Sequence, residues 1–165
     1  MRTHGGVLSG RMGSVRVTAK AEYAVRAVME LAGGEGEPVK RDTIVAAQAI
    51  PPKFLENILS ELRHAGLVES QRGSEGGYWL ALPPEKITVA DIMRAVEGPL
   101  ASVRSSRPET LEYEGLAEPL QYVWVALRTS IRTVLDRVTV ADLISGKLPK
   151  HVIKMTEDPD SWISQ

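Results

Sequence analysis

Cysteine is absent from all 165 residues of the sequence. Its absence excludes disulfide bonds, thiolate metal sites and a cysteine nucleophile. The sequence also has no stretch near the roughly 18 consecutive apolar residues that a membrane-spanning helix needs. Residues 1–14 contain no continuous apolar core of the kind a signal peptide has, and we expect them to form a disordered lead-in. These absences together predict a cytoplasmic protein with no membrane partner.

Neither positive nor negative charge is in excess. The chain has 20 Lys and Arg against 21 Asp and Glu, a net charge of −1. This balance argues against indiscriminate binding to nucleic acid, so a DNA-binding role must depend on where the cationic side chains lie. The 43% of hydrophobic and 25% of charged residues are typical of a globular chain, long enough here for a small domain and an additional arm.

The first half of the chain shows helical periodicity followed by two short strands. Apolar spacing predicts a helix over 18–32, a short helix after Lys40, and a third helix over 53–65 that ends at Gly66. Residues 67–71 and 78–82 then read as strands joined by the glycine-rich stretch RGSEGG. Helix, short helix, turn, helix and hairpin in this order predict a winged helix-turn-helix, a mainly α fold with a small β-hairpin.

The second half predicts a long helix. Thr88 opens a further helix with a capping signature, and the same four letters recur at Thr139. Prolines, serines and charges make 98–115 a loop. A helix over 116–138 then carries a seam of apolar residues spaced 4, 3, 4, 3, 4, which indicates pairing of two such helices in a homodimer. The proposed dimerisation residues are Leu120, Trp124, Leu127, Ile131, Val134 and Val138.

These patterns divide the chain into five segments. We expect the lead-in, a winged helix-turn-helix domain over 15–97, the loop over 98–115, a dimerisation helix region over 116–146 and an irregular tail over 147–165.

Cationic side chains fall where a winged helix meets DNA. Lys20 lies at the start of the first helix, Lys40 and Arg41 begin the second, and Lys53 opens the third. Helix N-termini donate N–H groups to phosphates, and the third helix of such a fold enters the major groove. Arg72 stands beside the hairpin tip. At this tip Gly76 and its neighbouring glycines allow close backbone approach, and an arginine can enter a narrow minor groove. The alternative is that Arg72 is an exposed, solvated arginine of the hairpin with no role in binding.

Three stretches resemble one family. VTAKAEYAVRAVMELA, IPPKFLENILSELRHAGLVESQRGSEGGYWLA and ITVADIMRAVEGP are similar to the Rrf-two family of bacterial transcription regulators, the group of IscR, CymR and NsrR. The similarity covers roughly residues 15–145. It implies a dimeric regulator of transcription, with repression the commoner sign, that binds double-stranded DNA. Because a dimer's two-fold symmetry is mirrored in its operator, an imperfect palindrome is the expected target.

The resemblance also assigns DNA contacts. In the family these come from the start of the first helix, the front of the recognition helix and the wing arginine. The matching residues here are Thr18, Lys20, Lys53, Glu56 and Arg72. A carboxylate at Glu56 can accept from the amino group of cytosine, or it is an exposed helix glutamate. Asn57 either reads adenine or is inert, and the sequence does not choose.

The sequence departs from the cluster-sensing members of the family. Those relatives carry three cysteines in the region that reads SVRSSRPETLEYEGLAEP here, with Ser105 near the first ligand position. A cysteine-ligated iron–sulfur cluster is therefore excluded, and no cofactor is expected. Glu22 occupies the place of an acidic ligand in some members, and we expect a surface carboxylate. The other branch of the family responds to a partner protein or a small molecule. That effector stays open, with the loop and the space below the long helix as places to look.

Two other functions compete with DNA-binding regulation. Catalysis has little support, because His4, His64 and His151 are scattered and form no triad or metal-site pattern. GSEGG precedes a strand and not a helix, so it is no phosphate loop. No catalytic or metal-binding residues are therefore predicted. A winged helix that binds only proteins is the alternative function, and the near-zero net charge keeps it open.

Overall fold

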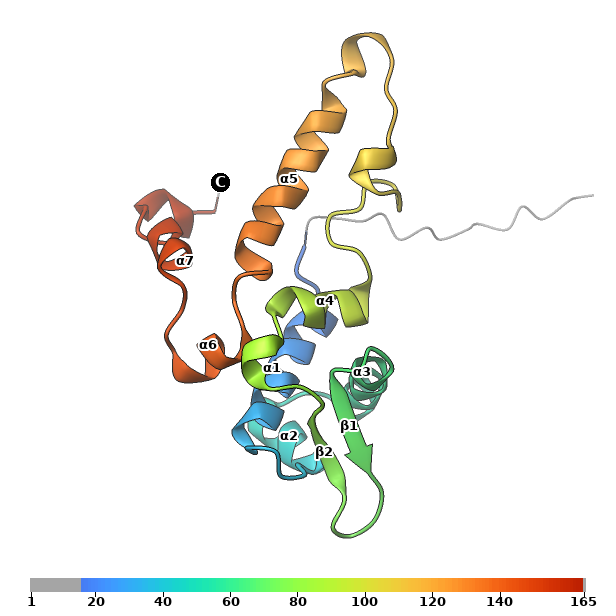
Figure 1. Cartoon of the computed structure of the whole chain (residues 1–165), viewed down its shortest axis with the longest axis vertical. Coiled ribbons are helices and arrows are strands. Elements are labelled where there is room, and N and C mark those ends of the chain that lie inside the picture. The colour runs from blue at the N-terminus through green and yellow to red at the C-terminus, as the bar shows by residue number, and fades with distance from the viewer. Residues whose placement is uncertain (1–15, 165) are drawn as a thin grey trace, which may run out of the picture.

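A computed structural model describes residues 16–164. The predicted fold class is confirmed, since the chain is mostly helical with one antiparallel hairpin (Figure 1). The predicted lead-in over 1–14 lies outside the described residues. Among the described residues, no helix has the length and apolarity that crossing a bilayer requires. The elements of the winged part are α1 (Ala19–Gly33), α2 (Arg41–Gln48), α3 (Pro52–His64), β1 (Val68–Gln71), β2 (Gly77–Leu80), the 3-10 turn η1 (Pro84–Lys86) and α4 (Val89–Glu97).

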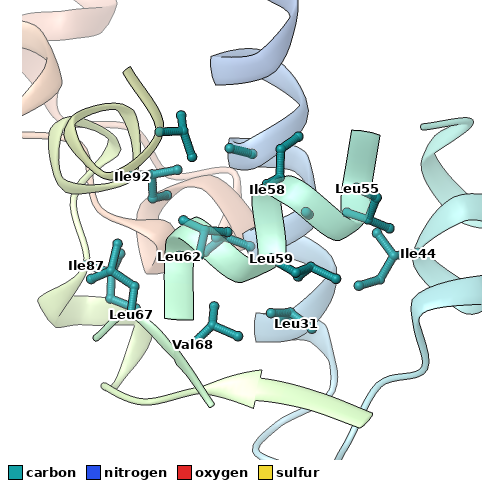
Figure 2. Close-up of a cluster of buried hydrophobic side chains, with 14 of the residues drawn as sticks. Leu31, Ile44, Leu55, Ile58, Leu59, Leu62, Leu67, Val68, Ile87 and Ile92 are labelled. Carbon is teal, nitrogen blue, oxygen red and sulfur yellow. The ribbon is translucent and has the colours of Figure 1, made fainter. Parts of the chain in front are cut away.

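The core lies beneath α3. This helix buries the leucines and isoleucine of its apolar face completely, leaves Phe54 40% exposed, and keeps its polar face in solvent, as its amphipathic sequence predicts. The turn before it is tight. Ala49 adopts a left-handed conformation with φ of 51°, and Pro52 occupies the first helical turn, where a missing N–H costs nothing. Figure 2 shows the α3 side chains meeting residues from the neighbouring elements. The fully buried side chains of α3 are Leu55, Ile58, Leu59 and Leu62.

The hairpin has four-residue strands, one residue shorter each than predicted. Val68 pairs with Leu80 and Gln71 with Gly77. Val39, just before α2, also pairs with Tyr78 through N–H to carbonyl bonds of 2.8 and 2.9 Å. This third backbone partner fixes the wing to the start of α2.

Both capping signatures are confirmed. Thr88 begins α4 and Thr139 begins α6 (Val140–Ser145), each with a reciprocal pair of hydrogen bonds to the aspartate three residues on. The two caps also meet, since the Val89 N–H donates to the Val138 carbonyl at 2.9 Å. The chain therefore returns to the winged part after the long helix, and α6 packs on α1.

The long helix α5 (Leu120–Leu135) is shorter at both ends than the predicted 116–138. Pro119 precedes it, and the 3-10 turns η2 (Pro108–Thr110) and η3 (Gly115–Ala117) occupy part of the predicted loop and the residues just beyond it. Val138 is a correction to the seam. It lies beyond α5 and is buried in its own chain, because its backbone joins the bridge to α4. Figure 1 shows α5 standing away from the winged part, with the preceding segment beside it.

The tail also differs from the irregular segment that we expected. It contains α7 (Lys150–Met155) and the 3-10 turn η4 (Pro159–Trp162). Pro149 immediately precedes α7, and Pro159 occupies the first position of η4, where its fixed φ suits a helical turn.

Candidate nucleic-acid interface

The exposed face of α3 carries three of the predicted contacts. Lys53, Glu56 and Asn57 are all exposed, opposite the buried leucines and isoleucine. Within residues 16–164, the side chains of Lys53 and Asn57 make no hydrogen bond or ion pair. Ser60 and His64 continue the same face and were not predicted as contacts, although they extend the steps of four, three and four residues that run from Lys53 through Asn57. This polar stripe is the surface of α3 that can enter a groove.

Glu56 is not a free carboxylate. It forms an ion pair with Arg41 at the start of α2, and Arg41 also pairs with Asp42 at 3.1 Å. The hydrogen bond and charge of Asp42, followed by the charge of Glu56, raise the pKa of the Arg41 guanidinium. Two predicted contacts on separate helices are thus brought together. A carboxylate in this pair must share or exchange its partner before it accepts from a base.

Lys40 connects α2 to the wing. Its Nζ donates to the backbone carbonyls of Ser74 and, at 3.3 Å, Gly73. Arg72 precedes that tip, is exposed, and has no side-chain partner among the described residues. The wing therefore presents one uncompensated guanidinium, while the neighbouring lysine holds the tip in place.

Gly76 has a steric role within the hairpin. It is buried, and a Cβ there would lie 2.1 Å from the Gln71 carbonyl oxygen. Any side chain would push the two arms of the tip apart. The requirement for glycine at this position comes from the hairpin itself, whatever the wing touches.

Two predicted contacts at the start of α1 are engaged inside the protein. Lys20 forms an ion pair with Glu61 of α3 at 2.8 Å. Thr18 caps α1 by accepting from the Ala21 N–H at 3.1 Å, and its hydroxyl donates to Glu97 at the end of α4. Both residues join α1 to other helices. Glu22, half exposed, pairs with Arg26 at 2.9 Å, as expected for a surface carboxylate.

The seam of α5 is incompletely covered by its own chain. No residue of this helix is buried. Leu120 is 38% exposed, and Trp124 donates its indole N–H to the Tyr113 hydroxyl at 3.0 Å. Tyr122 and Val123 are 77% and 52% exposed and lie off the predicted seam. The uncovered apolar surface is therefore wider than the seam.

A helix-turn-helix pair, a hairpin wing and an outward polar face on the second helix define a winged helix-turn-helix nucleic-acid-binding protein. Residues 17–146 match the model of the Rrf2 (Rrf-two) family, described as iron-dependent transcriptional regulators. The chain belongs to this family, and it is a DNA-binding transcriptional regulator, not an enzyme.

Individual relatives agree with this assignment. A protein of Mycobacterium tuberculosis strain H37Rv (Rv1287), which carries the name of an HTH-type transcriptional regulator, is 50% identical over 87% of this chain and 90% of its own. The HTH-type transcriptional regulator CymR of Bacillus subtilis is 37% identical, and its solved structure covers 79% of this chain and 96% of its own, with a TM-score of 0.66. The structure of T. potens IscR matches with a TM-score of 0.62 and 33% identity, covering 91% and 93%.

Iron, which the family description implies, does not fit the residues of this chain. There is no cysteine anywhere in the sequence. In the part of the chain that the structure describes, no three His, Asp or Glu side chains gather as metal ligands. The segment after α4 contributes arginine instead, and guanidinium groups repel a cation.

The Glu56–Arg41 pair leads to a first prediction. Glu56→Gln is expected to raise affinity for scrambled DNA about 3-fold, because Arg41 is released to meet phosphate. Loss of the cytosine acceptor is expected to reduce the ratio of operator to scrambled affinity by about 10-fold. Fluorescence anisotropy with both duplexes measures the two constants. Glu112→Gln, an equal change of charge at an exposed position before α5, is the control. An unchanged ratio in the Glu56 variant contradicts base recognition by this residue.

Proposed function

We propose that the chain forms a homodimer through α5 and represses transcription in the cytoplasm by binding an imperfect palindrome in double-stranded DNA. One α3 lies in the major groove of each half-site and the wing lies alongside. The observation that carries this proposal is the exposed stripe of α3 next to a wing with an unpaired arginine. No iron–sulfur cluster takes part, because the chain has no thiolates.

Dimerisation is supported by the exposure of α5. A helix of 16 residues with no buried side chain, and with Tyr122 and Val123 largely in solvent, is poorly stabilised in an isolated chain. Pairing with a second copy covers this apolar surface. A closed pair has two-fold symmetry, which places two recognition helices on one side of a duplex and predicts a palindromic target.

Fluorescence anisotropy tests DNA binding directly. Genomic fragments bound by the protein are recovered by footprinting, and the affinity of the purified protein for them is measured across a salt series. We expect nanomolar or tighter binding that falls steeply as salt rises. The alternative, a winged helix that binds only proteins, predicts little binding to any fragment even at low salt. Transcription in vitro from a bound promoter is expected to fall when the protein is added, and a rise contradicts repression.

Arg72 gives a second prediction. Arg72→Ala is expected to weaken operator binding about 3- to 10-fold and to reduce the slope of affinity against salt by about one ion, because one cation leaves the DNA. Preference at the A/T-rich flank is expected to weaken as well, since the wing meets that flank. Arg137→Ala, an exposed arginine beyond α5, is the matched control. An equal effect of both substitutions assigns the Arg72 change to net charge and removes the wing contact.

A further inference from the structure

A cavity of about 460 Å³ lies between the end of α4, the segment that follows it, and α5. Its volume is in the range of sites for small metabolites. The lining carries four arginines and one glutamate, a net charge of +3 in a chain whose total is −1. The charged residues are Arg94, Arg107, Arg128, Arg132 and Glu109.

The positive charge of this cavity is only partly compensated. Arg94 pairs with Asp136 at 2.8 Å, and Arg128 pairs with Glu109. The Nε of Arg128 is nevertheless buried and has no hydrogen-bond acceptor. Within residues 16–164, the side chains of Arg107 and Arg132 form no hydrogen bond or ion pair. A buried donor without an acceptor, such as the Nε of Arg128, is uncommon. The guanidinium groups of Arg107 and Arg132 are exposed and find no acceptor among the described residues.

The chemistry of these groups selects for anions. A guanidinium presents parallel N–H donors that match the oxygens of a carboxylate, sulfate or phosphate. The pKa of the only carboxylate in the lining responds to the same positive charge. A hydrogen bond from its own backbone N–H, followed by the guanidinium groups of Arg128 and Arg107, lowers the pKa of Glu109. Negative charge is thus favoured at this point of the molecule.

We propose that the cavity binds an anionic small molecule, a metabolite bearing carboxylate, sulfate or phosphate oxygens, and that this ligand regulates DNA binding. The regulatory part rests on the proposed function. Arg107 and Arg132 supply the free donors, and the buried edge of Arg128 completes the cradle.

The position of the cavity gives the ligand a route to the DNA-binding residues. Arg94 of α4 lines the cavity, and one turn further on Glu97 accepts from the hydroxyl of Thr18 at the start of α1. Arg128 and Arg132 lie on α5, the proposed dimerisation helix. Figure 1 shows α4 beneath the segment that runs beside α5. An anion held by Arg107 and by the two α5 arginines fixes the segment that follows α4, and with it the end of α4, against α5. The same coupling makes operator DNA alter the affinity for the anion.

The binding test uses the full chain without DNA. Isothermal titration calorimetry with potassium phosphate, potassium sulfate and potassium succinate, each at constant ionic strength against chloride, separates the tetrahedral oxyanions from carboxylates. We expect saturable binding of at least one of the three. The double variant R107Q/R132Q is expected to weaken it at least about 10-fold, because two charge-assisted bonds are lost. R104Q, at an exposed arginine of the same segment outside the lining, is expected to bind like wild type. Absence of saturable binding, or equal binding by R107Q/R132Q, overturns the proposal.

The regulatory test repeats operator anisotropy with and without the anion that binds. A change in operator affinity of about 5-fold or more is expected in wild type and is absent in R107Q/R132Q. Ionic strength is held constant because salt alone weakens protein–DNA binding. A chain that binds DNA but no anion contradicts only this inference. A chain that binds the anion but no DNA contradicts the proposed function and, with it, the regulatory part.

Discussion

Leu127→Asp is expected to dissociate the proposed homodimer and to lower operator affinity at least about 100-fold. Leu127 lies in the middle of α5 and is half-buried in the single chain, so pairing of two α5 helices completes its burial. A carboxylate there loses its hydration without gaining a partner, which costs several kcal/mol in each protomer. A monomer then holds one half-site only and loses the gain from simultaneous engagement of both. Size-exclusion chromatography with light scattering gives the mass, and anisotropy gives the affinity.

Two further variants separate assembly from folding. Leu127→Met conserves apolar volume and is expected to keep both the dimer and its affinity. Val123→Asp places the charge at a side chain that is 52% exposed, where the isolated chain keeps it hydrated. It is expected to give a folded monomer whose thermal unfolding midpoint no longer depends on protein concentration, because the stabilisation by pairing is lost. A wild-type monomer at micromolar concentration, or dimers in both aspartate variants, contradicts pairing through α5.

The winged part could be predicted from the sequence because each of its elements is specified locally. The apolar period places the buried face of α3, and Gly66 follows its last turn. Thr88 and Thr139 each cap a helix with an aspartate three residues on, a pattern that depends on four consecutive residues. Where the residues that specify a helix or its cap lie close together in the sequence, the sequence predicts the observed structure.

The bounds of α5 were predicted less well, because they depend on contacts between residues far apart in the sequence. A 4-3 spacing continues through Val138, but the helix ends at Leu135. Val138 is withdrawn from the seam by a backbone bond to Val89, a partner that sequence periodicity cannot show. Pro119 marks the start of α5 more accurately than the apolar pattern does, since proline is tolerated at a helix start but not in its interior.

In the candidate interface, the exposure of side chains could be predicted from the sequence, but their ion pairs could not. Exposure of Lys53, Asn57 and Arg72 follows from their places on a helix face and a hairpin tip. The ion pairs of Lys20 with Glu61 and of Arg41 with Glu56 join residues 41 and 15 positions apart, so only the folded chain reveals them.

The loop and the space below the long helix were named as places to look for an effector, but the arginine lining of the cavity there was not predicted, although the positions of its residues carry a signal. Arg128 and Arg132 are four residues apart and therefore share a face of α5, a helix whose other residues are all uncharged. Sequence alone does not show that α4 and the following segment close over them.

Gly76→Ala is expected to open the wing tip and to lower operator affinity about 10- to 100-fold, with a loss of about 1–3 kcal/mol in the free energy of unfolding. The added Cβ would lie 2.1 Å from the Gln71 carbonyl oxygen and 2.8 Å from the Arg72 carbonyl carbon. Both are backbone atoms, so no side-chain rotation relieves the clash and the two arms must separate. Arg72 and the carbonyls that bind Lys40 then lose their fixed positions. Anisotropy measures the affinity, and urea unfolding measures the stability.

Ser74→Ala is the matched control, because Ser74 is exposed at the same tip and contributes only its backbone carbonyl to Lys40. It is expected to leave affinity and stability unchanged. Hydrogen exchange at the Val39 and Tyr78 amides, which pair beside the tip end of β2, separates local opening from unfolding. Faster exchange there with protection retained in α3 is the expected pattern. An open wing that binds the operator as tightly as wild type contradicts a role for the tip in DNA binding and leaves recognition to α3 alone.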